Sequence, residues 1–247
     1  MTEQMTTMTD RLSVRVSPTI SVSGHREHRG AATAAGVLYI TGTIAGILSK
    51  AVLSSVSGAF DPVATASTDQ VAVATGAALI LVMGLSLALI PVVLMPVLRP
   101  VSEFLAYGYL VIRGAVETAC YVVLAAGVLT LVTLSGLGGP DETWRELGRV
   151  LVDSEAMANV LTVVFCVGAA LFYIALYRSR IAPRWLSGWG LVGVPIYLLA
   201  ALLAAFGVIE MNSTTQMLLF MPLALQEMVL AIWMIARGFR PIRPESE

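Results

Sequence analysis

The chain has 247 residues, of which 57% are hydrophobic and 13% charged, and its 15 basic and 16 acidic residues give a formal net charge of −1. Soluble domains carry about 25% charged residues, so this chain has too few charges to cover a globular surface in water. The composition excludes an intrinsically disordered chain, the charge balance offers no basic surface for nucleic acid, and two cysteines exclude a disulfide scaffold.

Six apolar stretches are long enough to cross a bilayer, which takes about 20 apolar residues in a helix. They are Ala31–Leu53, Val71–Leu98, Phe104–Leu134, Ala156–Tyr177, Leu186–Ile209 and Met217–Ala236. We therefore predict an all-α fold, a polytopic membrane bundle of six transmembrane helices over residues 31–239. The polar, Ser- and Thr-rich residues 1–30 predict a disordered leader, and residues 240–247 a short tail.

The connections between the stretches read mostly as loops, including residues 54–69 with their Gly58 and Pro62. In the connection of residues 135–155, Asp141 is placed to cap a short helix that runs to Asp153. Four apolar residues share one face of that helix: Trp144, Leu147, Val150 and Leu151. The helix either lies on the membrane surface or is a loop helix without lipid contact.

The basic residues predict the orientation. Eleven of the fifteen lie before the first stretch, in the second and fourth connections, or after the sixth stretch, and these segments share one side of the membrane. The others are Lys50, Arg113, Arg145 and Arg149. Because basic residues collect in the cytoplasm, we expect both termini to be cytoplasmic. The dominance of arginine over lysine, with abundant Ala and Val, suggests a GC-rich bacterial genome and hence the bacterial plasma membrane.

Two of the apolar stretches contain charges. Arg113 and Glu117 lie inside the third stretch, and Gln226 and Glu227 inside the sixth. A charged side chain at the bilayer centre costs about 2.5–3.5 kcal/mol on the most lenient scale, so each of these groups needs a partner. Arg113 and Glu117 are four residues apart and share a helix face, where an ion pair forms easily.

Depth brings the two stretches together. Arg113 is ten residues from Glu103 and Glu227 ten residues from Arg237, so each lies about 15 Å from the same end of the bundle. We predict a buried cluster of Arg113, Glu117 and Glu227. Further hydrogen bonds would come from Gln226 or Tyr121, and Glu103 and Tyr121 extend the polar stripe of the third stretch. Two carboxylates around one guanidinium leave the second carboxylate harder to ionise, so one of them can carry a proton.

Three functions are compatible with this cluster. It could bind a lipid or small amphiphile, with Arg113 holding an anionic group, or couple to protons through Glu117 or Glu227. It could instead be a charge network that only locks a structural or interaction subunit. An intramembrane enzyme is third, because no nucleophile and base stand beside the cluster and no catalytic motif is present.

The expected partners are the lipid bilayer and a small amphiphilic ligand, and the oligomeric state stays open. No cofactor or metal site is expected, since no cysteine or acidic cluster completes a coordination shell for the His25 and His28 pair. Gly42 and Gly46 in the first stretch permit close helix approach, either within the bundle or in a dimer. Pro222 lies five residues before Glu227, where a kink would open backbone beside the cluster.

Several local runs, taken in order, are similar to one family. They are GVLYITGTIAGILS, MPVLRPVSEFLAYGYLVIRGAVE, RSRIAPRWLSGWGLVG and PLALQEMVLAIWMIARGF. The chain resembles the bacterial membrane-protein family called domain of unknown function 4386 over most of residues 29–239. The resemblance implies a multi-spanning membrane protein without an assigned activity. It also implies that the family's characteristic arginine and glutamates correspond to Arg113, Glu117 and Glu227.

Overall fold

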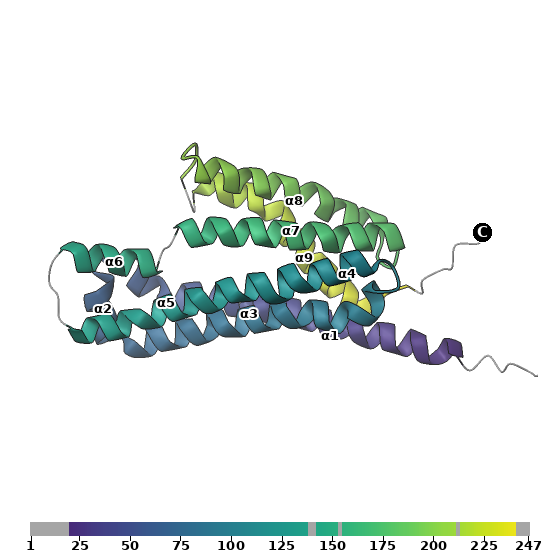
Figure 1. The fold of residues 1–247 in the computed structure, drawn as a ribbon, viewed down its shortest axis with the longest axis horizontal. Coiled ribbons are helices and arrows are strands. Elements are labelled where there is room, and N and C mark those ends of the chain that lie inside the picture. The colour runs from purple at the N-terminus through teal and green to yellow at the C-terminus, as the bar shows by residue number, and fades with distance from the viewer. Residues whose placement is uncertain (1–19, 138–141, 153–154, 211–212, 241–247) are drawn as a thin grey trace, which may run out of the picture.

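The computed structural model describes residues 20–137, 142–152, 155–210 and 213–240, which form helices and the turns between them. Long helices lie side by side in one elongated bundle (Figure 1). Within the described residues, six helical segments are long and apolar enough to span a membrane. They are α1 (Ile20–Ser57), α3 (Gln70–Leu98), the joined segment Glu103–Leu137, α7 (Glu155–Ser179), α8 (Arg184–Ala205) and α9 (Thr214–Arg237). The predicted all-α fold with six membrane-spanning helices is confirmed.

Most helix ends lie within about four residues of the predicted bounds, and the start of α1 is the exception. α1 begins at Ile20, so residues 20–30 are helical where a disordered leader was expected, while residues 1–19 and 241–247 lie outside the described part. α8 ends at Ala205, four residues early, because the chain turns at Gly207, which has a φ of 70°. This left-handed backbone suits glycine and ends the helix.

The third spanning segment is not one regular α-helix. It consists of α4 (Glu103–Tyr109), a π-helical stretch η1 (Leu110–Glu117) and α5 (Thr118–Leu137). A π-helix bonds each N–H to the carbonyl five residues back, which widens the turn, and such stretches are frequent at functional sites. Because η1 carries both Arg113 and Glu117, the irregular backbone coincides with the charges.

The spanning helices pack as two groups of three. One group contains α1, α3 and the segment α4–η1–α5, and the other contains α7, α8 and α9. The groups meet where α1 contacts α9 and where α4 and η1 contact α7. Glycines allow this approach: a Cβ added at Gly36 of α1 would lie 2.6 Å from the Ala231 carbonyl oxygen of α9. The two groups are therefore packed backbone to backbone at this seam.

The small residues of α1 also serve packing inside the first group. A Cβ at Gly42 would lie 3.1 Å from Leu87, and one at Gly46 would lie 2.6 Å from the Met83 sulfur, both on α3. The intramolecular interpretation of this glycine pair is confirmed. α9 continues as a helix through Pro222, so the backbone beside Glu227 remains helical.

Two short helices cap one end of the bundle. α2 (Pro62–Thr68) occupies a stretch predicted as loop; the Asp61 carboxylate accepts a hydrogen bond from the Ala64 N–H, and Pro62 stands in the first turn. This Asp-Pro start is a signal that the sequence carried. α6 (Glu142–Val152) confirms the predicted short helix, although Asp141 and Asp153 lie outside the described residues. Lipid contact of α6 stays a prediction.

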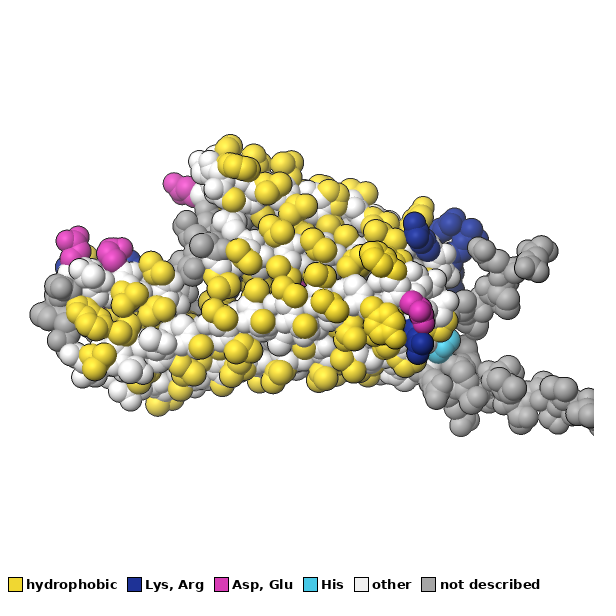
Figure 2. Space-filling view, in the orientation of Figure 1, with side chains coloured by type: hydrophobic (Ala, Val, Ile, Leu, Met, Phe, Trp, Pro, Cys, Tyr) yellow, Lys and Arg dark blue, Asp and Glu magenta, His cyan; other side chains and the backbone are white. Residues whose placement is uncertain are grey.

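The two ends of the bundle differ in charge, as Figure 2 shows for one face. We call one the arginine end, where α1 and α8 begin and α3, α7 and α9 finish; the arginines near these helix ends are Arg29, Arg99, Arg178, Arg180, Arg184, Arg237 and Arg240. The other is the acidic end, formed by the α2–α6 cap and the end of α8, with Asp61, Asp69, Glu142, Glu146 and Glu210 and also the two arginines of α6, Arg145 and Arg149. On the face shown in Figure 2, apolar side chains cover the surface between the ends, as expected for a bundle surrounded by lipid.

Candidate functional site

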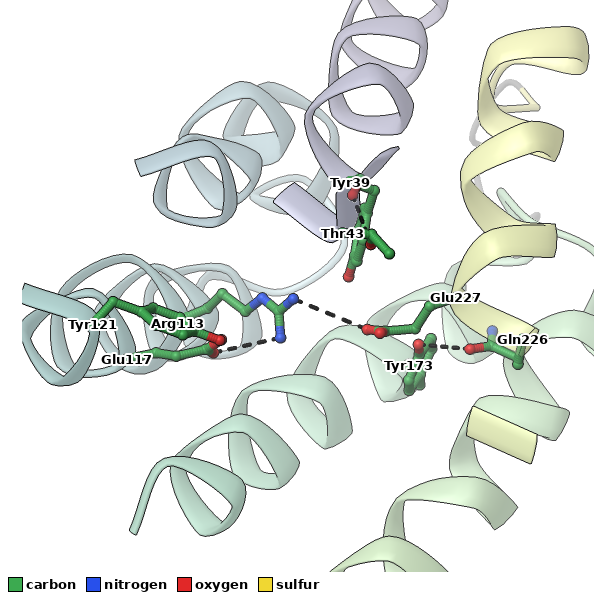
Figure 3. Close-up of polar contacts among 8 residues, drawn as sticks. All are labelled: Tyr39, Thr43, Arg113, Glu117, Tyr121, Tyr173, Gln226 and Glu227. Atoms are coloured by element: carbon green, nitrogen blue, oxygen red, sulfur yellow. Dashed lines mark hydrogen bonds and ion pairs between the residues drawn. The ribbon is translucent and has the colours of Figure 1, made fainter. Parts of the chain in front are cut away.

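The structure brings Arg113, Glu117 and Glu227 together in the middle of the bundle. The Arg113 guanidinium lies between the two carboxylates, with Nη1 3.4 Å from Glu117 Oε2 and Nη2 3.9 Å from Glu227 Oε1 (Figure 3). Arg113 and Glu117 are buried, and 12% of the Glu227 side chain is exposed. Because Arg113 and Glu117 belong to η1 and Glu227 to α9, the cluster bridges the two helix groups.

Aromatic rings enclose the guanidinium. The Phe165 ring of α7 lies 4.9 Å and the Tyr39 ring of α1 5.5 Å from the guanidinium carbon of Arg113. Arginine gains cation–π energy in such contacts, about 2 kcal/mol or more when water is excluded. The positive charge is thus stabilised by ring faces as well as by carboxylates.

The charges are only loosely paired. Charge-assisted hydrogen bonds between a guanidinium and a carboxylate have N···O distances near 2.7–2.9 Å, and both distances here are longer. Six buried side-chain atoms of the described residues lack a hydrogen-bond partner, and four of them belong to this cluster: Arg113 Nε and Nη1, Glu117 Oε2 and Glu227 Oε1. Buried polar groups are normally hydrogen-bonded, so this cluster is not a fully satisfied network.

Residues 34–238 match the family described as Domain of unknown function (DUF4386). The chain belongs to this family. In this DUF4386 protein the matched region extends from α1 to the end of α9 and contains the whole cluster. The resemblance seen in the sequence is therefore confirmed. Comparison with curated proteins and with solved structures gives no match.

The remaining predicted site residues of this DUF4386 protein have different places. Tyr121 donates a hydrogen bond from its hydroxyl to Glu117 Oε1 at 3.4 Å and so joins the cluster. Gln226 points away from Arg113: its Oε1 accepts from the Tyr173 hydroxyl at 2.7 Å and its Nε2 donates to the Leu186 carbonyl at 3.0 Å (Figure 3). Gln226 therefore ties α9 to α7 and α8 and does not bond to the charges.

Glu103 does not belong to the cluster. It is exposed at the arginine end, where it forms an ion pair with Arg99 at 3.0 Å. Ten residues of helix separate it from Arg113, which is about 15 Å along the axis, so a shared face could not bring it near. The hydrogen bond with Glu103 raises the pKa of the Arg99 guanidinium.

Sequence reasoning missed the aromatic surroundings. Tyr39, Phe165 and Tyr173 come from two other helices and are central to the site. Their ring types are common in membrane helices, so nothing in their local sequence separated them from core residues. Among the described residues, no group of three or more His, Cys, Asp or Glu side chains could hold a metal ion.

Proposed function

We propose that this integral membrane protein binds and releases a proton at its buried cluster, and that Glu227 is the carboxylate that exchanges it. The observation that carries the proposal is the one guanidinium shared between two buried carboxylates at 3.4 and 3.9 Å. With both carboxylates ionised the cluster has a net charge of −1 in a medium of low dielectric constant, which is costly. A proton removes that charge with no need for a cavity.

The sign of the charge argues against an anionic ligand. Such a ligand on Arg113 would meet Glu117 and Glu227 beside it and would raise the negative charge further. A purely structural network would be expected to satisfy its polar atoms, whereas four atoms here lack hydrogen bonds among the described residues. Proton exchange fits both observations.

Geometry separates the two carboxylates. Glu117 is fully buried, is the nearer to Arg113, and accepts a hydrogen bond from Tyr121. Each carboxylate has one oxygen without a hydrogen-bond partner, but Glu227 is farther from Arg113 and keeps some exposure. We therefore assign the fixed negative charge to Glu117 and the mobile proton to Glu227.

Other titratable groups surround the Glu227 carboxylate on the neighbouring helices. They are Arg113, Glu117, Tyr39, Tyr109, Tyr121, Cys166, Tyr173 and Tyr197. Tyrosine and cysteine are neutral near pH 7 and can accept and donate hydrogen bonds. They add no second positive charge that would hold Glu227 ionised.

The charged ends support an orientation for the exchange. With the arginine end in the cytoplasm of a bacterial cell, both termini lie inside and the acidic end faces outward. Trp185 and Trp189, whose rings are 6.5 Å apart at the start of α8, then lie at the cytoplasmic interface, where aromatic anchors belong. The protein would thus hold a proton site between two compartments of different pH.

Infrared spectroscopy tests the assignment, because a protonated carboxyl group absorbs apart from a carboxylate. We expect the purified protein to show a buried carboxyl band that titrates with pH, and Glu227→Gln to abolish it. Glu103→Gln removes an exposed acid and is the matched control that should retain the band. A wild-type protein without such a band would contradict proton exchange and favour the structural network, and a band lost in Glu117→Gln alone would contradict the choice of Glu227.

A further inference from the structure

One face of α7 carries polar residues at helical spacing. Asn159, Thr162, Cys166 and Tyr173 are separated by three, four and seven residues, so they line one side of the helix. Thr162, Cys166 and Tyr173 are buried in the bundle. Polar side chains at the interface of membrane helices hydrogen-bond to neighbouring helices, so this face marks where α7 meets polar partners.

Thr162 and Tyr197 form a hydroxyl pair between α7 and α8. Their oxygens are 3.3 Å apart, and Thr162 donates its own proton to the Ala158 carbonyl at 2.9 Å. Tyr197 is therefore the donor in the pair. The Asn159 Oδ1 atom, one turn nearer the acidic end, is buried and has no hydrogen-bond partner among the described residues.

The pair stands about two helical turns from Glu227, on the side of the acidic end. The Tyr197 ring packs on Phe220 of α9 at 4.5 Å, and Phe220 precedes Glu227 by seven residues, which is about 10 Å along the axis. Tyr197 also meets Phe165 at 6.0 Å, and the same Phe165 ring covers Arg113. Cys166, one turn inward from Thr162, lies between the pair and the cluster.

The opposite side of the cluster is closed. Between Glu227 and the arginine end, the second helix group buries large side chains completely: Phe172, Leu176, Ile181, Leu186, Leu230 and Met234. The Tyr109 and Phe172 rings stack at 4.9 Å, and Tyr173 and Gln226 use their polar atoms on each other and on the Leu186 carbonyl. On the acidic side, the described apolar residues of α8 and α9 buried beyond Glu227 are Leu223, Val194 and the small Ala200 and Ala201, so fewer large side chains fill this side.

We infer that protons reach Glu227 from the acidic end along the α7–α8 interface, through the Thr162–Tyr197 hydroxyl pair and water molecules that it orders. The inference rests on the proposed proton exchange at Glu227. For each transfer the Thr162 hydroxyl turns from the Ala158 carbonyl to a water on the side of Glu227, gives that water its proton and takes the proton of Tyr197. A water on the acidic side then reprotonates Tyr197, so neither hydroxyl becomes charged. The last transfer protonates Glu227, and release reverses the sequence.

Hydrogen–deuterium exchange of the Glu227 carboxyl band measures this access directly, since the band shifts when the proton is replaced. We expect Thr162→Val and Tyr197→Phe to slow the shift by about tenfold or more, with an unchanged equilibrium titration. Thr162→Ser keeps the hydroxyl and should exchange at the wild-type rate.

Two matched controls come from the lipid-facing and arginine-end surfaces. Thr130→Val removes a hydroxyl that, like that of Thr162, donates to the carbonyl four residues back. Tyr107→Phe removes the hydroxyl of an exposed tyrosine. Both should exchange like wild type, as should Tyr173→Phe on the closed side. If Thr162→Val and Tyr197→Phe both exchange at the wild-type rate, the route is wrong but proton exchange at Glu227 can still hold. The same conclusion follows if only Tyr173→Phe exchanges slowly. A wild-type chain without a titrating carboxyl band would overturn the proposed function and the route together.

Discussion

At the scale of the residue, Arg113 is the group on which the others depend. Its guanidinium is the positive charge for Glu117 and Glu227, and two aromatic rings hold it in place. The Arg113 side chain is buried within a membrane-spanning segment, so the guanidinium has no access to bulk water. Removing Arg113 would leave two acids without a counter-charge.

We expect Arg113→Leu to lower the free energy of unfolding by about 3–5 kcal/mol, because breaking a buried ion pair leaves uncompensated charge. Thermal or chemical unfolding in mild detergent measures this. A triple variant that also changes Glu117 and Glu227 to Leu should recover much of the loss, since apolar replacement of a whole buried network is often tolerated. A wild-type melting temperature in Arg113→Leu would show that the cluster contributes nothing to folding.

At the scale of the element, the π-helical stretch and the glycine seams decide where the charges meet. The sequence placed Arg113 and Glu117 four apart on a helix face, and this spacing was sufficient to predict their pairing. It did not reveal η1, which packs against α3 and α7, because the spacing of the residues does not distinguish a π-helical turn from an α-helical one. Glu103 shows the limit of the shared-face argument, since two residues on one face that are ten positions apart lie about 15 Å apart along the helix.

The close contact between α1 and α9 at Gly36 predicts how a larger side chain there would affect stability. Gly36→Ala should lower the free energy of unfolding by about 1–3 kcal/mol, because its Cβ would meet the Ala231 carbonyl and Ile235 at 2.6 and 2.7 Å. Gly30→Ala is the matched control in the same helix, with no atom within 4 Å of the new Cβ. It should be neutral or stabilising by about 0.5–1 kcal/mol, since alanine favours a helix over glycine. Equal effects of the two changes on the melting temperature would contradict the close seam.

At the scale of the whole molecule, the separation of charges along the bundle predicts its orientation. Arginines gather at the end where α1 begins and α9 finishes, and acids gather at the capped end. The proposed proton route opens toward the acidic end, so orientation decides which compartment supplies the proton.

Reporter fusions check that orientation. A fluorescent protein fused after Glu247 should fluoresce, because it folds in the cytoplasm, whereas a periplasmic alkaline phosphatase at the same place should be inactive. The phosphatase inserted after Asp61, before α2, should be active on the outer side. The reverse pattern would contradict the cytoplasmic arginine end and would invert the direction of proton access.

The sequence by itself determined the number of spanning helices, their approximate bounds, the family and the three charges that meet. The spans and the paired charges follow from local composition and helix periodicity, and the family from the resemblance of ordered sequence runs, none of which needs the contacts between helices. Only the tertiary structure decided that Gln226 turns to Tyr173, that Tyr39 and Phe165 enclose Arg113, and that the ion pairs are long. The physical reason is that helix rotation and depth are set by side-chain packing between segments far apart in the chain, and no local pattern records that packing.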